Sequence, residues 1–219
     1  LILLIIIISI LSGCKKNEAP TASAPMPDNP ADYKGTIGIA KIIAHPALDA
    51  VEQGVIDELK VQGYVNAVID VQNANGEIAT AASIATKFKS QKADVVLGIA
   101  TPMALALANQ MRDTPVVFSA VTDPIDAGLR TTNDTEKTNI TGVSDMTPVK
   151  EQVILATRLK DVKKLGFIYN AGESNSVVLH NLTKQACDEL GIELISTTVT
   201  NTSEVKQATE IIAPKVDAI

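Results

Sequence analysis

The sequence predicts an α/β protein with two lobes, each built around a parallel sheet, and a hinge between them. Short apolar runs alternate with longer segments of helical periodicity from residue 35 onward, and this alternation is typical of parallel sheets with right-handed crossovers. A polar stretch interrupts the alternation, which then resumes. We therefore expect a first lobe over 35–121, a crossover and hinge over 122–145, and a second lobe over 146–219. The second lobe has too few predicted elements to close its sheet, so we expect it to be incomplete in this chain.

The first lobe is predicted to alternate strands and helices. Each strand is a short run rich in Val, Ile and Ala, and each helix has apolar residues three and four positions apart. Ile78, Ala81 and Phe88, for example, share one face of a predicted helix. The strands are expected at 36–42, 66–72, 93–100 and 115–121, and the helices at 46–62, 77–90 and 102–111.

The second half repeats the pattern after a strand-like segment at 138–145. Strands are expected at 163–170 and 192–200, and helices at 148–159, 176–190 and 203–213. The last residues, VDAI, begin another apolar strand.

Composition and motifs narrow the function. The net charge is −6, so no basic surface argues for nucleic acid or anionic lipid. The sequence contains no HExxH, CxxC, GxSxG, GxGxxG or P-loop pattern. We therefore expect a protein that is not an enzyme and that has no metal and no cofactor.

The N-terminal segment indicates export and lipidation. Residues 1–13 are typical of the remnant of a signal peptide, since their apolar run ends at Leu11 and is too short to span a bilayer. Leu11-Ser12-Gly13-Cys14 fits a bacterial lipobox, which predicts lipidation of Cys14; the alternative is a buried amphipathic start with a chance cysteine. Residues 14–34 are rich in Pro, Ala and Ser, as expected for a lipid anchor followed by a disordered tether. The expected location is extracytoplasmic, as a membrane-anchored lipoprotein. Cys187 then has no disulfide partner and is expected in the core.

Candidate binding residues follow the predicted strands, because ligands in open parallel sheets bind beyond the carboxyl ends of the strands. His45 precedes Pro46 after the first strand, and Thr101 precedes Pro102 after the third. Each residue could simply start a helix. Each could equally place a polar group, and the N–H groups of a helix N-terminus, beside an anion.

Further candidates lie at the fourth strand and in the second lobe. Thr122 and Asp123 end the fourth strand, with Pro124 after them, and Asp145 closes the segment before the second lobe. We expect Thr122 to contact a ligand, whereas Asp123 could contact it or only cap the turn. Glu173 comes just before the helix that starts at Asn175 and Ser176.

The charges at these positions suggest the kind of ligand. Arginine occurs only at positions 112, 130 and 158, none of them in a strand-end loop, so hydroxyl and backbone N–H groups would have to hold a carboxylate. Asp123, Asp145 or Glu173 could meet an ammonium group. Together these two requirements describe an amino acid.

The chain resembles a known family in its order of motifs: LSGC, IGIAKIIAHPALDAVEQGVIDELKVQGY, GIATPMALALA, VVFSAVTDPIDAGL, NITGVSDM and LGFIYNAGESNS. It is similar to ABC-transporter substrate-binding lipoproteins of the tryptophan/tyrosine-binding type over about residues 35–219. The resemblance implies the type I periplasmic-binding-protein fold, with two Rossmann-like lobes and the ligand in the cleft. It also adds Asp49 and Asn170 to the expected ligand-binding residues.

The resemblance further implies a monomer that captures an aromatic or hydrophobic amino acid and delivers it to an ABC permease and its ATPase. A ligand that touches both lobes would favour the closed form. The alternative is a receptor of the same fold for a nucleoside, a sugar or a signal molecule that feeds a sensory kinase.

Overall fold

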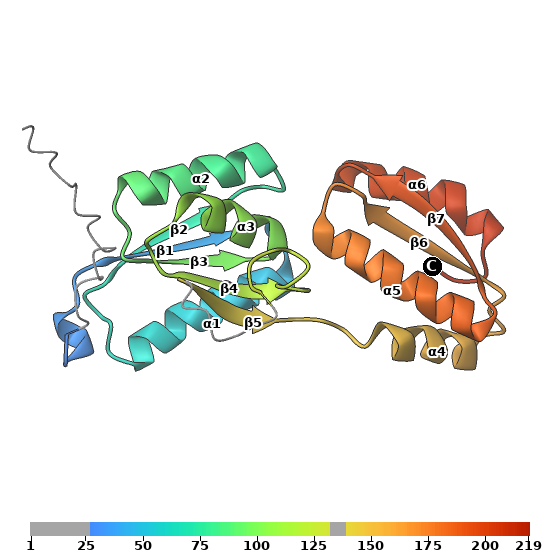
Figure 1. Cartoon of the computed structure of the whole chain (residues 1–219), viewed down its shortest axis with the longest axis horizontal. Coiled ribbons are helices and arrows are strands. Elements are labelled where there is room, and N and C mark those ends of the chain that lie inside the picture. The colour runs from blue at the N-terminus through green and yellow to red at the C-terminus, as the bar shows by residue number, and fades with distance from the viewer. Residues whose placement is uncertain (1–26, 132–138) are drawn as a thin grey trace, which may run out of the picture.

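The computed structural model describes residues 27–131 and 139–219, which form two α/β lobes (Figure 1). Cys14 and the predicted signal remnant lie outside the described residues. The end of the predicted tether is folded, since Pro30–Asp32 forms a 3-10 helix and Tyr33 is buried against Tyr64 in edge-to-face contact at 5.8 Å. The folded body therefore begins several residues before position 35.

The first lobe is a five-stranded parallel sheet with the order β2-β1-β3-β4-β5. Its strands are β1 (Thr36–Lys41), β2 (Val68–Asn73), β3 (Val95–Ile99), β4 (Val116–Val121) and β5 (Ile140–Ser144). Its helices are α1 (Pro46–Val61), α2 (Ile78–Ser90) and α3 (Thr101–Gln110). All seven elements expected over 36–121 are present, within a few residues of their predicted bounds.

The position of β5 differs from the sequence prediction. We expected 122–145 to form the crossover and hinge, but β5 pairs in parallel with β4 and completes the first sheet. A β-strand leaves its backbone N–H and C=O groups unpaired unless it joins a sheet. The backbone groups of β5 pair with those of β4 at the edge of the first sheet. In the described part of the chain, the connection to the second lobe therefore begins only after Ser144.

The second lobe pairs two parallel strands and packs helices on them. Its elements are α4 (Val149–Leu159), β6 (Lys164–Asn170), α5 (Ser174–Leu190), β7 (Glu193–Val199) and α6 (Val205–Ile212). Ala218 forms a parallel bridge with Leu165 on β6, which agrees with the prediction that VDAI starts another strand.

The helices bury apolar side chains on both faces of the first sheet. Phe88 of α2 and Met103 of α3 are fully buried in one cluster, while α1 packs on the opposite face around Ile39 and Ile99. In the second lobe Cys187 is fully buried, as expected for a core residue. Its burial raises the pKa of the thiol. Among the described residues, no helix is long and apolar enough to cross a membrane.

Candidate functional site

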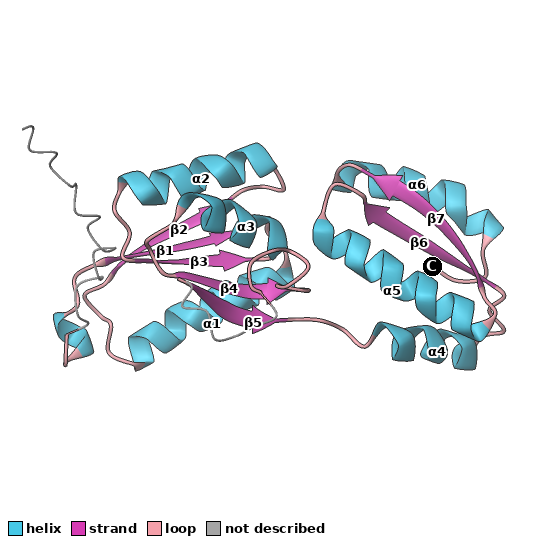
Figure 2. Cartoon of the chain, in the orientation of Figure 1, coloured by secondary structure: helices cyan, strands magenta, loops and turns pink. Residues whose placement is uncertain are grey.

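The two sheets direct their carboxyl ends toward each other. Figure 2 shows the strands of the first sheet ending on the side of the second lobe, and β6 and β7 ending on the side of the first lobe. The loops after the strands of both lobes thus face a common space, which is where ligands bind in open parallel sheets.

A cavity of about 410 Å³ lies between the lobes, with residues of α2 and α3 on one side and the start of α5 on the other. This volume falls within the range of small-molecule sites, about 300–1,000 Å³. Its apolar lining consists of Ile78, Ala82, Pro102, Leu105 and Ala106. Its polar side chains are Thr101, Asn109, Gln110, Glu173, Ser174 and Asn175.

Thr101 contributes a buried hydroxyl at the first-lobe wall. The residue is only 2 % exposed, yet its Oγ1 has no hydrogen-bond partner in the described structure. It stands at the first position of α3, after Ala100, whose backbone has φ 77°. A non-glycine residue rarely adopts such a φ, and this backbone geometry is often found at functional sites. The predicted site residue Thr101 therefore presents an unsatisfied polar atom beside a helix N-terminus.

The start of α5 supplies a matching pair of atoms from the second lobe. Ser174 Oγ and Asn175 Oδ1 are buried and lack hydrogen-bond partners in the described structure. Both residues line the same cavity as Thr101. Buried polar groups in folded proteins are normally hydrogen-bonded, so these three atoms around one cavity are available to bond a molecule within it.

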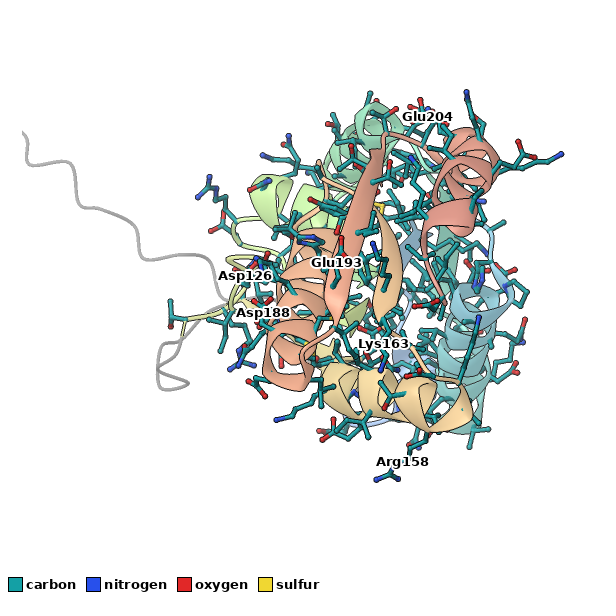
Figure 3. The ribbon with its side chains drawn as sticks, turned by 90° about the vertical axis from the view of Figure 1, so that its right-hand side faces the viewer. Asp126, Arg158, Lys163, Asp188, Glu193 and Glu204 are labelled. Atoms are coloured by element: carbon teal, nitrogen blue, oxygen red, sulfur yellow. The ribbon has the colours of Figure 1, made fainter. Side chains whose placement is uncertain are left out.

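Glu173 is the charged residue among those that line this cavity. It precedes α5 in an extended conformation and makes no capping bond with its side chain. Its Oε1 accepts a hydrogen bond of 2.9 Å from Nδ2 of Asn170. The cavity thus has one negative charge and no lysine or arginine to oppose it. Figure 3 shows Arg158 extending from α4 at the periphery of the second lobe.

A second cavity, of about 560 Å³, adjoins the carboxyl ends of β1, β2 and β7. Glu173 lines it as well, together with the predicted residues Asn170 and Ser176. Asn170 is held in place, because its Oδ1 accepts from the backbone N–H of Gly172 at 3.0 Å and its Nδ2 donates to Glu173. Glu173 therefore belongs to both cavities.

The two predicted residues of the first loop have structural partners. His45 caps α1, with Nδ1 accepting from the backbone N–H of Ala47 at 3.2 Å. Asp49 lies 2.6 Å from Nζ of Lys41, which also contacts Glu52 at 3.0 Å. The Lys41 ammonium lowers the pKa of Asp49, and its hydrogen bond to Asp49 is the main cause that raises the pKa of Lys41. Neither His45 nor Asp49 lines the two cavities.

The residues after β4 also have structural roles. Oδ1 of Asp123 accepts from the backbone N–H groups of Ile125 at 2.9 Å and Asp126 at 3.0 Å, so Asp123 caps the turn. The carbonyl of Thr122 accepts from Ser144 Oγ at 2.8 Å, which joins the ends of β4 and β5. Asp145 is exposed. None of Thr122, Asp123 and Asp145 lines the two cavities, and contact of these residues with a ligand stays a prediction.

Comparison with known proteins identifies the family. The family described as ABC transporter substrate binding protein matches residues 36–219. The chain belongs to this family. The resemblance that its motifs suggested is thereby confirmed, and the family is one of binding proteins rather than enzymes.

Among relatives of this substrate-binding protein, a tyrosine-binding protein of Clostridioides difficile (strain R20291) is 33 % identical over 216 residues, covering 97 % of this chain and 63 % of the relative. An ABC domain in complex with L-Trp from Streptococcus pneumoniae is 34 % identical, with a TM-score of 0.81, over 85 % of this chain and 64 % of that one. A ligand-free, open substrate binding protein from Clostridium difficile is 35 % identical with a TM-score of 0.58, over 84 % and 63 %. The chain therefore spans just under two thirds of the length of these relatives.

Sequence reasoning missed several residues of this substrate-binding protein. Ser174 was not singled out although it adjoins Asn175, and Asn109 and Gln110 lie at the far end of α3 from the predicted helix cap. His180 was also not singled out; its ring stacks on Tyr169 at 4.4 Å and its Nε2 lies 2.9 Å from Ser196 Oγ. His180, Tyr169 and Ser196 come together only because α5 packs on β6 and β7, so no local pattern could have shown these contacts.

Proposed function

We propose that this chain captures an α-amino acid with a hydrophobic, preferably aromatic, side chain in the 410 Å³ cavity between its lobes. The observation that carries the proposal is the set of three buried polar atoms without partners: Thr101 Oγ1 from the first lobe, and Ser174 Oγ and Asn175 Oδ1 from the second. A ligand that bonds all three must contact both lobes.

The ligand carboxylate binds at the helix N-termini. The hydroxyl groups of Thr101 and Ser174 donate to it, and the positive ends of α3 and α5 favour the negative charge. This arrangement replaces the arginine clamp that many carboxylate sites use, in keeping with a cavity lined by neither lysine nor arginine.

The ligand ammonium binds at Glu173. Of the three carboxylates considered from the sequence, Asp123 caps a turn and Asp145 is exposed outside the cavity, whereas Glu173 lines it. Asn175 Oδ1 is a second acceptor within the same turn of α5. An ammonium group donates three hydrogen bonds, so both acceptors can be used at once.

The ligand side chain lies against the apolar part of the cavity. Leu105 and Ala106 of α3 and Ile78 and Ala82 of α2 form this wall. Such a surface favours a large apolar group through the area removed from water. The tyrosine-binding relative and the structure with L-Trp support an aromatic one.

Binding couples to closure of the lobes. The TM-score is higher for the structure with L-Trp than for the ligand-free, open structure, 0.81 against 0.58, at nearly equal identity and coverage. We take the present lobe arrangement as the closed one. In the cell, the closed form would be recognised by an ABC permease and its ATPase, with lipidated Cys14 holding the protein at the outer face of a membrane and residues up to about 27 serving as the tether.

Titration with the twenty amino acids, followed by calorimetry and thermal unfolding, tests this function. We expect hydrophobic and aromatic amino acids to raise the melting temperature, because a ligand that binds only the folded state stabilises it. A shift with a nucleoside or a sugar, and with no amino acid, would overturn the proposal and favour the receptor for a signal molecule.

A further inference from the structure

Helix α3 lines the interlobe cavity along its whole length. Its lining residues are Thr101, Pro102, Leu105, Ala106, Asn109 and Gln110. Steps of four and five residues place them on one face of the helix. This face is polar at the start, apolar in the middle and polar again at the end, and only the first two parts have a role in the proposed function.

The polar groups at the end of α3 are two side-chain amides without partners. Neither Asn109 nor Gln110 makes a hydrogen bond with its side chain within residues 27–131 and 139–219. Asn109 is exposed and Gln110 is half-buried. Both amides are therefore available to a molecule in the cavity.

The spacing along α3 fits an amino acid with one aromatic ring. Thr101 and Gln110 are separated by about 13.5 Å along the helix axis at about 1.5 Å per residue. Hydrogen bonds of about 2.8 Å at each end leave about 8 Å between them. That length suits a side chain with a single ring on a methylene group, provided that the ring carries a hydrogen-bonding atom at its far end.

We propose that Asn109 and Gln110 select amino acids whose apolar side chain ends in a hydrogen-bonding group. The proposal rests on the proposed function, in which the carboxylate lies at Thr101. An amide has both a donor and an acceptor, so it can accept from the phenol O–H of tyrosine or from the indole N–H of tryptophan. Phenylalanine has no such atom and leaves the amides unpaired.

The expected preference is modest, because the amides are not fully buried. A site that buries its polar groups completely rejects an analogue that lacks the partner atom by several orders of magnitude. Here water can reach Asn109 in the free protein. A single neutral hydrogen bond then gives a preference of about 3- to 10-fold for tyrosine over phenylalanine.

Calorimetric titration of the chain with tyrosine, tryptophan and phenylalanine tests the inference. The variants are Asn109→Leu alone and Asn109→Leu with Gln110→Met, which remove the amides at similar volume. The matched control is Gln152→Met, an exposed glutamine on α4 outside both cavities. We expect the double variant to bring the ratio of tyrosine to phenylalanine affinity close to one, and the control to keep the ratio of the unaltered protein.

The outcomes separate this inference from the function on which it rests. Equal affinities for tyrosine and phenylalanine in the unaltered protein, or a ratio that survives in the double variant, would overturn the selectivity while leaving an amino-acid receptor. Absence of binding by every amino acid would overturn the function itself. Should the double variant fail to fold, the exposed Asn109→Leu variant gives the same comparison.

Discussion

Replacing Thr101 by valine should weaken ligand binding and at the same time stabilise the free protein. The two side chains have nearly the same shape, so the change removes one hydroxyl and little else. That hydroxyl is buried at 2 % exposure and unpaired in the described structure. The hydroxyl therefore lowers the stability of the ligand-free protein, whereas in the complex it forms a hydrogen bond with the ligand.

The magnitudes follow from the burial of Thr101 and the charge of the ligand. An unsatisfied buried polar group costs about 1–3 kcal/mol. Because water has some access to the cavity, we take the lower end of this range and expect the valine variant to have a free energy of unfolding about 1 kcal/mol higher than the unaltered protein. For a chain of this size, about 1 kcal/mol corresponds to a rise of about 2–4 °C in melting temperature. A hydrogen bond to a charged carboxylate contributes about 1.5–3 kcal/mol, so affinity should fall about 10- to 150-fold.

Thermal unfolding without ligand and calorimetry with tyrosine measure the two effects separately. Thr183→Val serves as the control, because Thr183 is equally buried at 3 % exposure but its Oγ1 donates to the carbonyl of Leu179 at 2.8 Å. We expect that variant to lose stability and keep its affinity. A Thr101→Val variant with a lower melting temperature and unchanged affinity would refute the assignment of this hydroxyl to the ligand.

Three further predictions concern charged residues. Glu173→Gln should weaken amino-acid binding by about 1.5–3 kcal/mol in calorimetry, while the affinity for the same ligand without its α-amino group stays unchanged. Equal losses of affinity for the amino acid and for this deamino analogue would contradict a contact with the ammonium. Asp123→Ala should lower the free energy of unfolding by about 1 kcal/mol through loss of two capping bonds, with unchanged affinity, and a variant that loses affinity alone would return Asp123 to the ligand. Urea unfolding across pH should show a contribution from Asp49 that is present above its ordinary pKa of 3.8 and is lost as pH falls below it, because Lys41 lowers that pKa in the folded state. The contribution of Lys41 should be complete below pH 10.5 and fade above it; Lys41→Met should abolish both, and an unchanged acid limb in this variant would argue against the pairing.

Most of the fold could be predicted from the sequence because its signals are local. The helices that begin at Pro46 and Thr101 have proline in the first turn, and the strands are short apolar runs. The membership of β5 in the first sheet could not be predicted in this way, since it depends on pairing with β4 over an intervening polar stretch. Local patterns predict that a strand exists, but they do not say which edge it joins.

Site residues could be predicted from the sequence where their position directly after a strand is enough to bring them to the cavity. Thr101, Glu173 and Asn175 follow strands and lie at the cavity, as the rule for parallel sheets indicates. The same rule selected Asp123, and the family resemblance added Asp49. Asp123 instead accepts from backbone N–H groups, and Asp49 pairs with Lys41. The sequence shows where a carboxylate lies along the chain, but not whether another group already neutralises it.

The short connection between β5 and α4 makes the two halves of the site a single intramolecular system. Within the described residues, only 145–148 join the lobes (Figure 1). The N–H of Asp145 donates to the carbonyl of Val121, that of Met146 to Ser144 Oγ, and that of Val149 to the carbonyl of Thr147. Because this connector is short and partly ordered, each lobe experiences a high effective concentration of the other lobe's binding residues. Lengthening it with flexible residues would lower affinity without touching any contact to the ligand.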